Sequence, residues 1–274
     1  MKAKILNLNG EEIGSIELPE QFKEALNPNL IKRAVLAVRS TKYQPKGVSK
    51  EAGKRASAKL SRRRRQYRGS YGHGISRVPR KIFWRRGTQF GWEGAFAPGT
   101  VGGRKAHPSK SDKILKKNIN KKERRKAIRS AISATINPEL VKVNHKLPKK
   151  YPLIIDSKIE SLNKTKQVVD LLKKLDLSEE LKRLSVKKIR AGKGKTRGRK
   201  YKTKKGPLIV IAKDCSLQKS ARNLPGINIV KVNLLNAEIL APSTLPGRLT
   251  IWSKDAIDIL AKQKLFTNTP NIEE

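Results

Sequence analysis

The chain has 274 residues, and its 64 Lys and Arg against 22 Asp and Glu give a formal net charge of +42. A compact body of that charge repels itself unless a polyanion neutralises it. No run of about 18 apolar residues exists to span a bilayer, and the first residues contain no apolar signal region. The single cysteine, Cys215, excludes an intrachain disulfide framework and fits a reducing cytosol. We therefore expect a cytoplasmic protein with an anionic partner other than a membrane.

The positive charge is concentrated in two segments. Residues 52–111 contain 16 Lys or Arg and one acid, Glu93, whereas residues 181–213 contain 14 Lys or Arg and no acid. These two segments, called here the first and second basic segments, carry +29 of the +42, so the remaining residues are closer to an ordinary globular composition. This division predicts a folded core with two RNA-facing segments.

The N-terminal part of the chain predicts ordered elements followed by a long extension. Residues 4–18 predict a hairpin or two short strands around the turn Asn9-Gly10, and Asn27-Pro28 begins a helix whose apolar residues recur at helical spacing. Residues 47–110 have no sustained apolar period and are interrupted by glycines and prolines. We expect them to form an irregular extension. It should be disordered in the isolated protein, because it buries too little apolar surface to offset its ordering entropy.

The remainder of the chain has an α/β pattern. Asp112 opens a long helical stripe that ends before Asn137-Pro138, and Ser178 and Ser253 are predicted N-caps of later helices. Other helices are expected at 139–145, 164–175, 234–240 and 254–265, and strands at 153–155, 208–212, 227–232 and 249–252. Continuous apolar strands alternating with helices imply a mostly parallel sheet with helices on both faces, a Rossmann-like three-layer α/β fold. The predicted organisation is a single globular α/β domain from 1–46 and 111–265, an inserted extension at 47–110, and a polar tail at 266–274.

Both basic segments supply candidate RNA contacts. Arginine forks suit phosphate oxygens, and each neutralised phosphate releases counterions. The eighteen candidate RNA contacts are Lys54, Arg55, Arg62, Arg63, Arg64, Arg65, Arg68, Arg77, Arg80, Arg104, Lys105, Lys188, Arg190, Lys193, Lys195, Arg197, Arg199 and Lys200. The alternative interpretation of such runs is a solvated surface or a localisation signal. RNA binding is favoured because aromatic residues and glycines follow the first cluster, although stacking on bases and local packing are equally open for Phe83 and Trp84.

Motifs for catalysis and for small ligands are missing from the sequence. Ala191–Thr196 is similar to a phosphate-binding loop, but Ile189 stands where the first glycine belongs. The three histidines do not combine with Cys215 at zinc-ligand spacing. Nothing groups the acids as a hydrolase or nuclease would require. We therefore expect no catalytic residues, no cofactor, no metal ligands and no small-molecule substrate.

Several segments resemble one protein family. Gly94–Gly99 (Gly-Ala-Phe-Ala-Pro-Gly) and Gly102–Pro108 (Gly-Gly-Arg-Lys-Ala-His-Pro) resemble the L-four family of large-subunit ribosomal proteins, in its archaeal and eukaryotic branch. Further matching segments follow in the same order at 72–80, 188–195, 206–210, 222–227, 240–242 and 246–249. Each match is weak alone, but together they span most of the chain and are highly specific.

The resemblance implies a structural constituent of the large ribosomal subunit, which binds large-subunit rRNA early in assembly and adjoins other ribosomal proteins. In the family the extension lines the constriction of the nascent-polypeptide exit tunnel, so the nascent chain is an expected partner. The tunnel region corresponds to residues 77–96, with candidate tunnel-lining residues Arg80, Lys81, Trp84, Arg85, Arg86 and Gln89. The segment Lys81–Arg86 is bulkier than the family's usual glycine-rich tip. The chain ends soon after its last helix, which implies an archaeal-type member. Any Mg²⁺ is expected to belong to the rRNA and to have no protein ligands.

Two other functions stay open at this point. One is a freestanding RNA chaperone or regulator, since the resemblance includes bacterial proteins that repress messenger RNA. The other is a nucleic-acid enzyme, which the scattered acids disfavour. Comigration with large ribosomal subunits, as opposed to a mostly free cellular pool, would distinguish the ribosomal function from the first of these.

Overall fold

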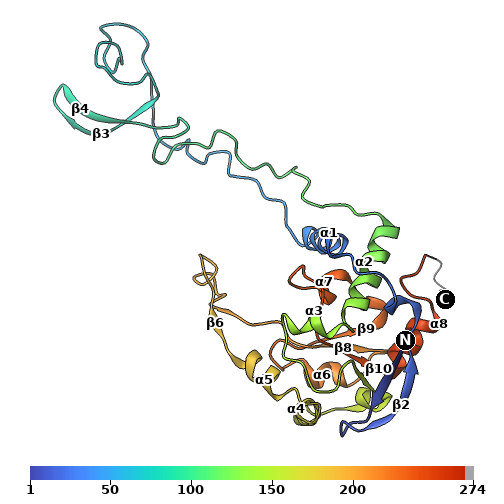
Figure 1. Ribbon diagram of the computed structural model, residues 1–274. Helices are drawn as coiled ribbons and strands as arrows, with labels where there is room; N and C mark the ends of the chain where they lie inside the picture. Colours follow the sequence, from blue (N-terminus) through green and yellow to red (C-terminus); the bar gives the residue numbers. More distant parts are fainter. Residues whose placement is uncertain (269–274) are drawn as a thin grey trace. The chain divides into compact units, whose positions relative to one another are not determined.

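The computed structural model describes residues 1–268 and divides into two compact units (Figure 1). Unit 1 combines Met1–Lys42 with the chain from Lys116 onward, and unit 2 is Tyr43–Leu115. The domain boundaries expected from the sequence, with an extension at 47–110 inserted into one globular domain, stay a prediction. The predicted polar tail lies mostly outside the described residues, at 269–274.

Unit 1 is built on a six-stranded sheet of order β2-β1-β5-β10-β8-β9. Its strands are β1 (Lys2–Leu6), β2 (Glu12–Glu17), β5 (Leu153–Ile155), β8 (Leu208–Ile211), β9 (Asn228–Lys231) and β10 (Thr250–Ser253). The pair β1–β2 is antiparallel and every other pair is parallel. The mostly parallel sheet predicted from the apolar strands is therefore confirmed, with the N-terminal hairpin at one edge.

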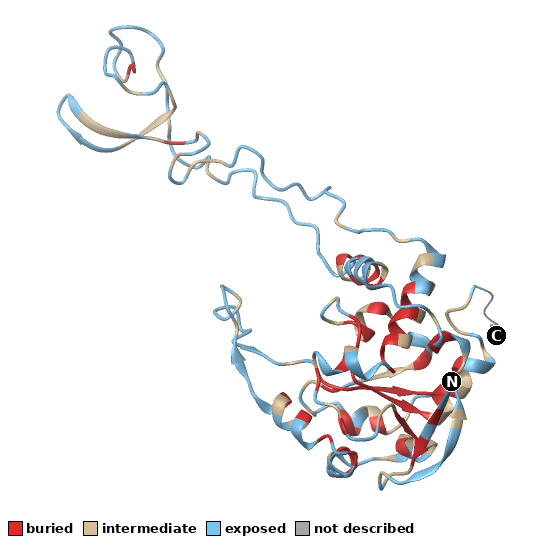
Figure 2. Ribbon diagram, in the orientation of Figure 1, coloured by how far each residue is buried: buried red, intermediate tan, exposed pale blue. Residues whose placement is uncertain are grey.

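The central strands β5, β8 and β10 are buried on both faces, as the burial colouring of Figure 2 shows, whereas the edge strand β2 is mostly exposed. Side chains of successive strand residues point to opposite faces. Ile154 and Trp252 therefore enter one apolar core, whereas Ile155 and Ile251 enter the other. Trp252 also packs edge-on against Phe22, with ring centroids 5.1 Å apart. This alternation of two buried faces explains why the central strands are apolar throughout.

Helices cover each face. The core that contains Trp252 is covered by α1 (Pro28–Ser40), α2 (Lys121–Ala134), α7 (Ala237–Leu240), α8 (Lys254–Lys262) and the 3-10 helices η1 (Glu20–Phe22) and η3 (Val232–Leu234). The opposite core is covered by α3 (Pro138–Lys142), α4 (Thr165–Lys174), α5 (Ser178–Ser185), α6 (Leu217–Ala221) and the 3-10 helix η2 (Ser157–Ser161). The predicted three-layer α/β architecture is thus confirmed.

The start of α2 differs from the prediction. The helical stripe seemed to open at Asp112, but the helix begins at Lys121 and Ile114 is exposed. Lysines at 113, 116 and 117 would repel one another on a common helix face. In addition, the backbone N–H of Lys117 donates to Ser40 Oγ (2.8 Å), which holds this residue against the end of α1 without helical hydrogen bonding.

Two predicted N-caps are also wrong in detail. Ser178 is the first residue of α5, and the buried Leu177 occupies the cap position. Ser253 does precede α8, but its hydroxyl makes no capping hydrogen bond and is buried without a partner among the described residues. The helix ends at Lys262, three residues earlier than expected, and Lys264 has a positive φ of 43° that is incompatible with continued helix.

The two basic segments contain hairpins that the sequence interpretation did not anticipate. Unit 2 carries β3 (Arg80–Arg86) and β4 (Gln89–Gly94), so the expected extension is not irregular throughout. In unit 1, β6 (Lys188–Ile189) pairs with β7 (Tyr201–Lys202) inside the second basic segment. The loop between β6 and β7 contains Ala191–Thr196. It joins two strands, whereas a phosphate-binding loop leads from a strand into a helix.

Candidate RNA interface

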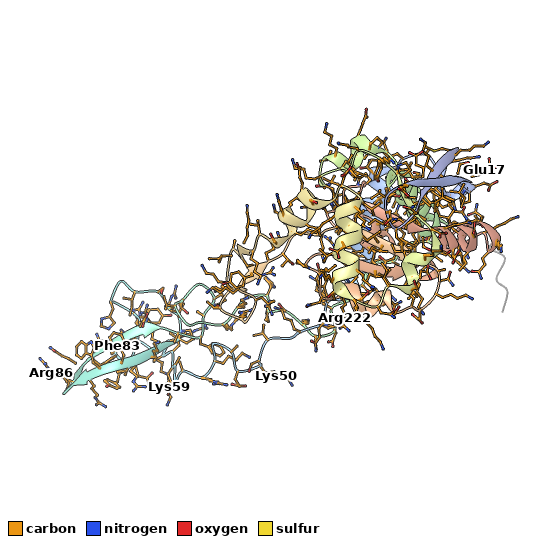
Figure 3. All side chains as sticks on the ribbon, turned by 90° about the horizontal axis from the view of Figure 1, so that it is seen from below. Glu17, Lys50, Lys59, Phe83, Arg86 and Arg222 are labelled. Atoms are coloured by element: carbon orange, nitrogen blue, oxygen red, sulfur yellow. The ribbon has the colours of Figure 1, made fainter. Side chains whose placement is uncertain are left out.

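The β3–β4 hairpin organises the middle of unit 2. Gly87 and Thr88 form its two-residue loop, and Gly87 has a positive φ of 58°, which glycine adopts without strain. Phe83 is the extra residue of a β-bulge between Ile82 and Trp84. It is 63% exposed, and Figure 3 shows it on the hairpin near Arg86. The Gly-Thr loop between aromatic-containing runs is the signal by which the sequence could have revealed the hairpin.

The register divides the hairpin into two faces. One face carries Lys81, Trp84, Arg86, Gln89, Gly91 and Glu93, and the other carries Arg80, Ile82, Arg85, Phe90 and Trp92. On the first face, Lys81 lies 3.9 Å from the directly opposed Glu93. Also on this face, the Trp84 indole covers Gly91, because a Cβ built on Gly91 would lie 1.9 Å from Trp84 Nε1. Trp84 therefore packs locally and remains 49% exposed.

The second face carries aromatic rings that pack together and are contacted by arginine side chains. Phe90 packs edge-on against both Tyr67 and Trp92, with centroid distances of 5.2 Å in each pair. The Arg80 guanidinium lies 5.5 Å from the Trp92 ring, and that of Arg85 lies 5.7 Å from the Tyr67 ring. The two guanidinium groups thus form cation–π interactions with the faces of these rings. They are therefore held in position without losing their charge.

The first basic segment continues around this hairpin. Lys59 forms an antiparallel bridge with Arg80, through two backbone hydrogen bonds of 3.1 Å. The run Arg62–Arg65 is fully exposed in the turn that follows, and Figure 3 shows side chains such as Lys50 and Lys59 extending from the backbone of unit 2. Arg104 and Lys54 both lie 6.0 Å from the Phe96 ring. Unit 2 thus presents cations along its length.

The second basic segment is a hairpin whose cations have different environments. Arg190 donates from Nε to the carbonyl oxygen of Arg199 (3.0 Å) and from a terminal nitrogen to that of Tyr201 (3.4 Å), so it braces the hairpin. The six other candidates here are exposed: Lys188, Lys193, Lys195, Arg197, Arg199 and Lys200. Arg190 is therefore the one candidate in this hairpin with an evident structural task.

The candidate RNA contacts have no carboxylate partners among the described residues, a property that they share with other exposed cations such as Lys23 and Lys166. None of the eighteen candidate RNA contacts forms an ion pair within residues 1–268. Elsewhere in unit 1, some cations meet carboxylates: Arg129 lies 2.7 Å from Glu24, and Arg33 lies 3.1 Å from Glu123. The unpaired cations can neutralise phosphate oxygens without first giving up a carboxylate partner.

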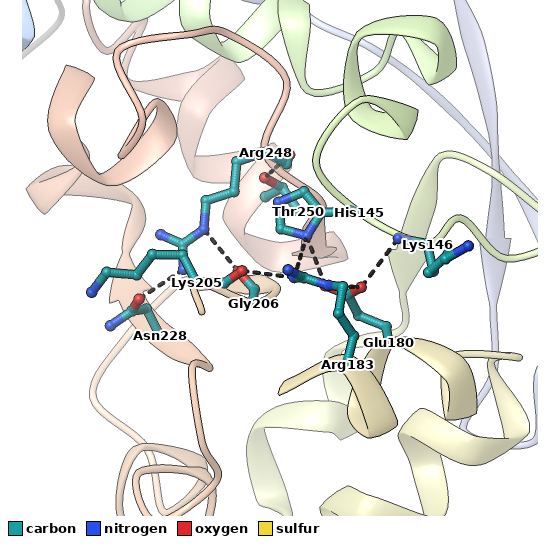
Figure 4. A network of polar contacts seen from close by, with 9 residues as sticks. All are labelled: His145, Lys146, Glu180, Arg183, Lys205, Gly206, Asn228, Arg248 and Thr250. Carbon is teal, nitrogen blue, oxygen red and sulfur yellow. Dashed lines mark hydrogen bonds and ion pairs between the residues drawn. The ribbon is translucent and has the colours of Figure 1, made fainter. Parts of the chain in front are cut away.

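A buried polar network anchors the root of the β6–β7 hairpin (Figure 4). Glu180, which is fully buried, accepts hydrogen bonds from Arg183 Nε (2.7 Å) and from the Lys146 N–H (3.1 Å), and His145 Nδ1 lies 2.7 Å from its other oxygen. Arg183 also donates to the carbonyl oxygen of Lys205 (2.8 Å). Burial alone would raise the pKa of Glu180, but the hydrogen bonds from Arg183, His145 and Lys146 outweigh it and lower the pKa to about 2. Sequence reasoning missed this network, because its members are far apart in the chain.

Neither a metal-binding cluster nor a membrane-spanning helix is found in the part of the chain that the structure describes. Residues 1–268 contain no group of three or more His, Cys, Asp or Glu placed to hold a metal ion. Among the same residues, no helix has the length and apolar character needed to cross a membrane.

Comparison with known proteins agrees with the resemblance. Residues 16–263 match the ribosomal protein L4/L1 family. Large ribosomal subunit protein uL4 of Nanoarchaeum equitans is 49% identical over 268 residues, covering 97% of this chain and 100% of that protein. The proteins of the same name from Archaeoglobus fulgidus and Methanococcus maripaludis are 42% and 44% identical, covering 96% and 94% of this chain and 99% and 98% of those proteins.

These relatives confirm the family and the archaeal type expected from the sequence. They are structural proteins of the cytoplasmic ribosome and not members of an enzyme family, and the family indicates no cofactor. The chain belongs to the ribosomal protein L4/L1 family and is a structural constituent of the large ribosomal subunit, with its function in translation.

Proposed function

We propose that the chain binds large-subunit rRNA early in assembly through its two basic segments. In this proposal residues 1–46 and 111–265 form the body, and residues 47–110 form an extension that lies between rRNA helices. Neighbouring ribosomal proteins are further partners. The lysines and arginines neutralise phosphates that would otherwise repel one another at close approach, and such contacts position the protein more than they discriminate between base sequences.

The observation that carries the proposal is the concentration of unpaired cations in the two basic segments, where none of the eighteen candidate RNA contacts forms an ion pair within residues 1–268. Unit 2 contains 19 Lys and Arg against three acids, Glu51, Glu93 and Asp112, so its own carboxylates are too few to neutralise it. A polyanion is the partner that resolves this imbalance. The family's place in the large subunit favours rRNA as that polyanion.

Affinity for transcribed large-subunit rRNA tests the proposal. Replacing Arg62, Arg63, Arg64 and Arg65 by alanine lowers the net charge by four. A matched control replaces Lys23, Lys32, Lys166 and Lys173, which are exposed and unpaired among the described residues. We expect the arginine variant to bind more weakly, with a plot of log affinity against log salt that is shallower by about three. Equal affinities and slopes for the two variants would show that net charge alone drives binding, and would contradict specific contact by this cluster.

We further propose that the β3–β4 hairpin lines the constriction of the nascent-polypeptide exit tunnel. The family resemblance favours this location for residues 77–96. The two faces of the hairpin refine the candidate set, because Arg80 and Arg85 are engaged by aromatic rings on one face. Lys81, Trp84, Arg86 and Gln89 share the other face, which we propose faces the nascent chain.

A further inference from the structure

A cavity of about 500 Å³ lies beside the root of the β6–β7 hairpin, within unit 1. It is open to solvent on one side and is lined by residues that follow α3, by Arg183 of α5, by residues 202–205 and by the loop at 242–248. Five of its lining residues are cationic and none is acidic: Arg183, Lys202, Lys204, Lys205 and Arg248. The volume falls within the range of roughly 300–1,000 Å³ that is usual for ligand sites. The lining therefore selects for an anion of small-molecule size.

Arg248 is the unusual member of this lining. It is 3% exposed, and its guanidinium donates to the carbonyl oxygens of Gly206 (3.0 Å) and Ile239 (2.7 Å) and to Asn228 Oδ1 (2.7 Å). All three acceptors are uncharged, and no carboxylate of residues 1–268 forms an ion pair with Arg248. Burial lowers the pKa of Arg248 to about 10. A buried charge is costly unless it is paired. An anion in the cavity would supply the negative charge that no carboxylate of residues 1–268 places beside Arg248.

Arg183 shows the contrast within the same cavity. Its charge is compensated by Glu180, at 2.5 Å (Figure 4). The uncompensated positive charge of the cavity is therefore that of Arg248 and of the lysines at 202, 204 and 205. An anion seated there would meet several cations at once.

The cavity also has an apolar wall. Pro242 and Leu245 line it, and Leu245 is 55% exposed. The loop that bears them packs closely against Leu140, because a Cβ at Gly247 would lie only 2.5 Å from the Leu140 carbonyl oxygen. Gly247 also has a positive φ of 91°, which glycine adopts without strain. A ligand that combines an anionic group with a weakly polar body would match both parts of this lining. A nucleotide has both.

We propose that this cavity receives one unpaired nucleotide of RNA, whose phosphate lies among Arg248 and the lysines and whose base lies against Pro242 and Leu245. The inference rests on the proposed binding of rRNA and adds to it a discrete pocket in the body. Recognition of RNA through bases that are splayed out of a helix and seated against side chains is a common mode.

Two leucine substitutions in the full-length chain test this site. Leu245→Asp places a carboxylate at the cavity wall, and because Leu245 is exposed the fold is retained. Leu234→Asp is the matched control, since Leu234 is 62% exposed and does not line the cavity. The probe is a short fluorescein-labelled oligouridine, titrated at a series of KCl concentrations. We expect Leu245→Asp to weaken binding about tenfold relative to the control, with a salt dependence reduced by about one phosphate contact. A 4-thiouridine version of the oligonucleotide should cross-link to the peptide that contains residues 242–248.

The other outcomes distinguish failure of the site from failure of RNA binding. If both variants and the original chain bind the oligonucleotide equally, with cross-links confined to the two basic segments outside the cavity, the RNA-binding proposal stands and the pocket is wrong. If none of the three binds, both proposals fall. If free uridine 5′-monophosphate raises the melting temperature of the original chain but not of Leu245→Asp, while all three bind the oligonucleotide equally, the cavity takes a free nucleotide and its assignment to RNA is overturned.

Discussion

The indole ring of Trp84 lies directly on the backbone of Gly91, its cross-strand partner in the β3–β4 hairpin. The absence of a side chain at residue 91 leaves room for the ring, and the ring shields a glycine that would otherwise weaken the strand. The exposed bulge residue Phe83 adjoins Trp84 on the same strand. The bulk of Trp84 is therefore accommodated by a specific glycine on the opposite strand.

Gly91→Ala should displace the Trp84 ring and leave the body of the protein unchanged. A Cβ at residue 91 would overlap the indole nitrogen at 1.9 Å, and the ring, being a side chain, moves more readily than backbone. In a ¹H–¹⁵N spectrum, the indole signal assigned to Trp84 should shift while that of the buried Trp252 does not. Gly14→Ala is the control, since a Cβ at Gly14 meets nothing within 4 Å. An unchanged Trp84 signal in Gly91→Ala would contradict the stacking.

Photo-cross-linking should distinguish the two faces of the hairpin inside the ribosome. A benzophenone amino acid at Trp84 or Gln89 is expected to cross-link to a nascent chain stalled in the tunnel. The same group at Phe90 should not do so, because Phe90 packs between Tyr67 and Trp92 on the opposite face. Efficient cross-linking from Phe90, with none from Trp84, would reverse the proposed orientation. Cross-linking from neither face would remove the hairpin from the tunnel wall.

Sequence periodicity predicted the body well because burial controls it. The apolar strands at Leu153–Ile155 and Leu208–Ile211 are buried on both faces, and Asn27-Pro28 begins α1 as its capping chemistry predicts. Outside the two basic segments the errors concern mostly where helices begin and end, whereas the hairpins that were missed altogether lie where burial gives little signal. The β3–β4 hairpin is held by cross-strand and cation–aromatic contacts among exposed residues, which leave no apolar period in the sequence.

The buried network and the cavity had a different reason for escaping prediction. Glu180 belongs to a helix that looks like an ordinary amphipathic surface helix, and its partner His145 is 35 residues away. In the sequence, Arg248 stands out only within the segment 246–249, which resembles the family. Its burial among three uncharged acceptors depends on the tertiary fold, so no local pattern could reveal that its charge is uncompensated.

Glu180→Gln should remove a pH-dependent contribution to stability. The folded-state pKa of Glu180 is about 2, below its ordinary value of 4.5, so its contribution is fully present above about pH 4.5 and is lost as the pH falls toward 2. The shift corresponds to about 3 kcal/mol at pH 7. Urea unfolding of the original chain and the variant should therefore differ by about that amount at pH 7, and by less than half of it at about pH 3. The exposed neighbour Glu179, changed to Gln, serves as the control. A difference independent of pH would mean that Glu180 acts through packing and not through its charge.

Two asparagines at helix starts should differ in their contributions to stability. Asn27 Oδ1 accepts a hydrogen bond from the Leu30 N–H (3.1 Å) at the start of α1, whereas Asn120 precedes α2 without a capping hydrogen bond from its side chain. Asn27→Ala leaves that helical N–H unsatisfied and should lower the free energy of unfolding by about 1 kcal/mol. Asn120→Ala should change it by less than about 0.5 kcal/mol, as for other surface substitutions. Chemical denaturation of the two variants checks this, because the residue types and the substitutions are identical. Equal destabilisation would show that position before a helix, and not the hydrogen bond itself, sets the cost.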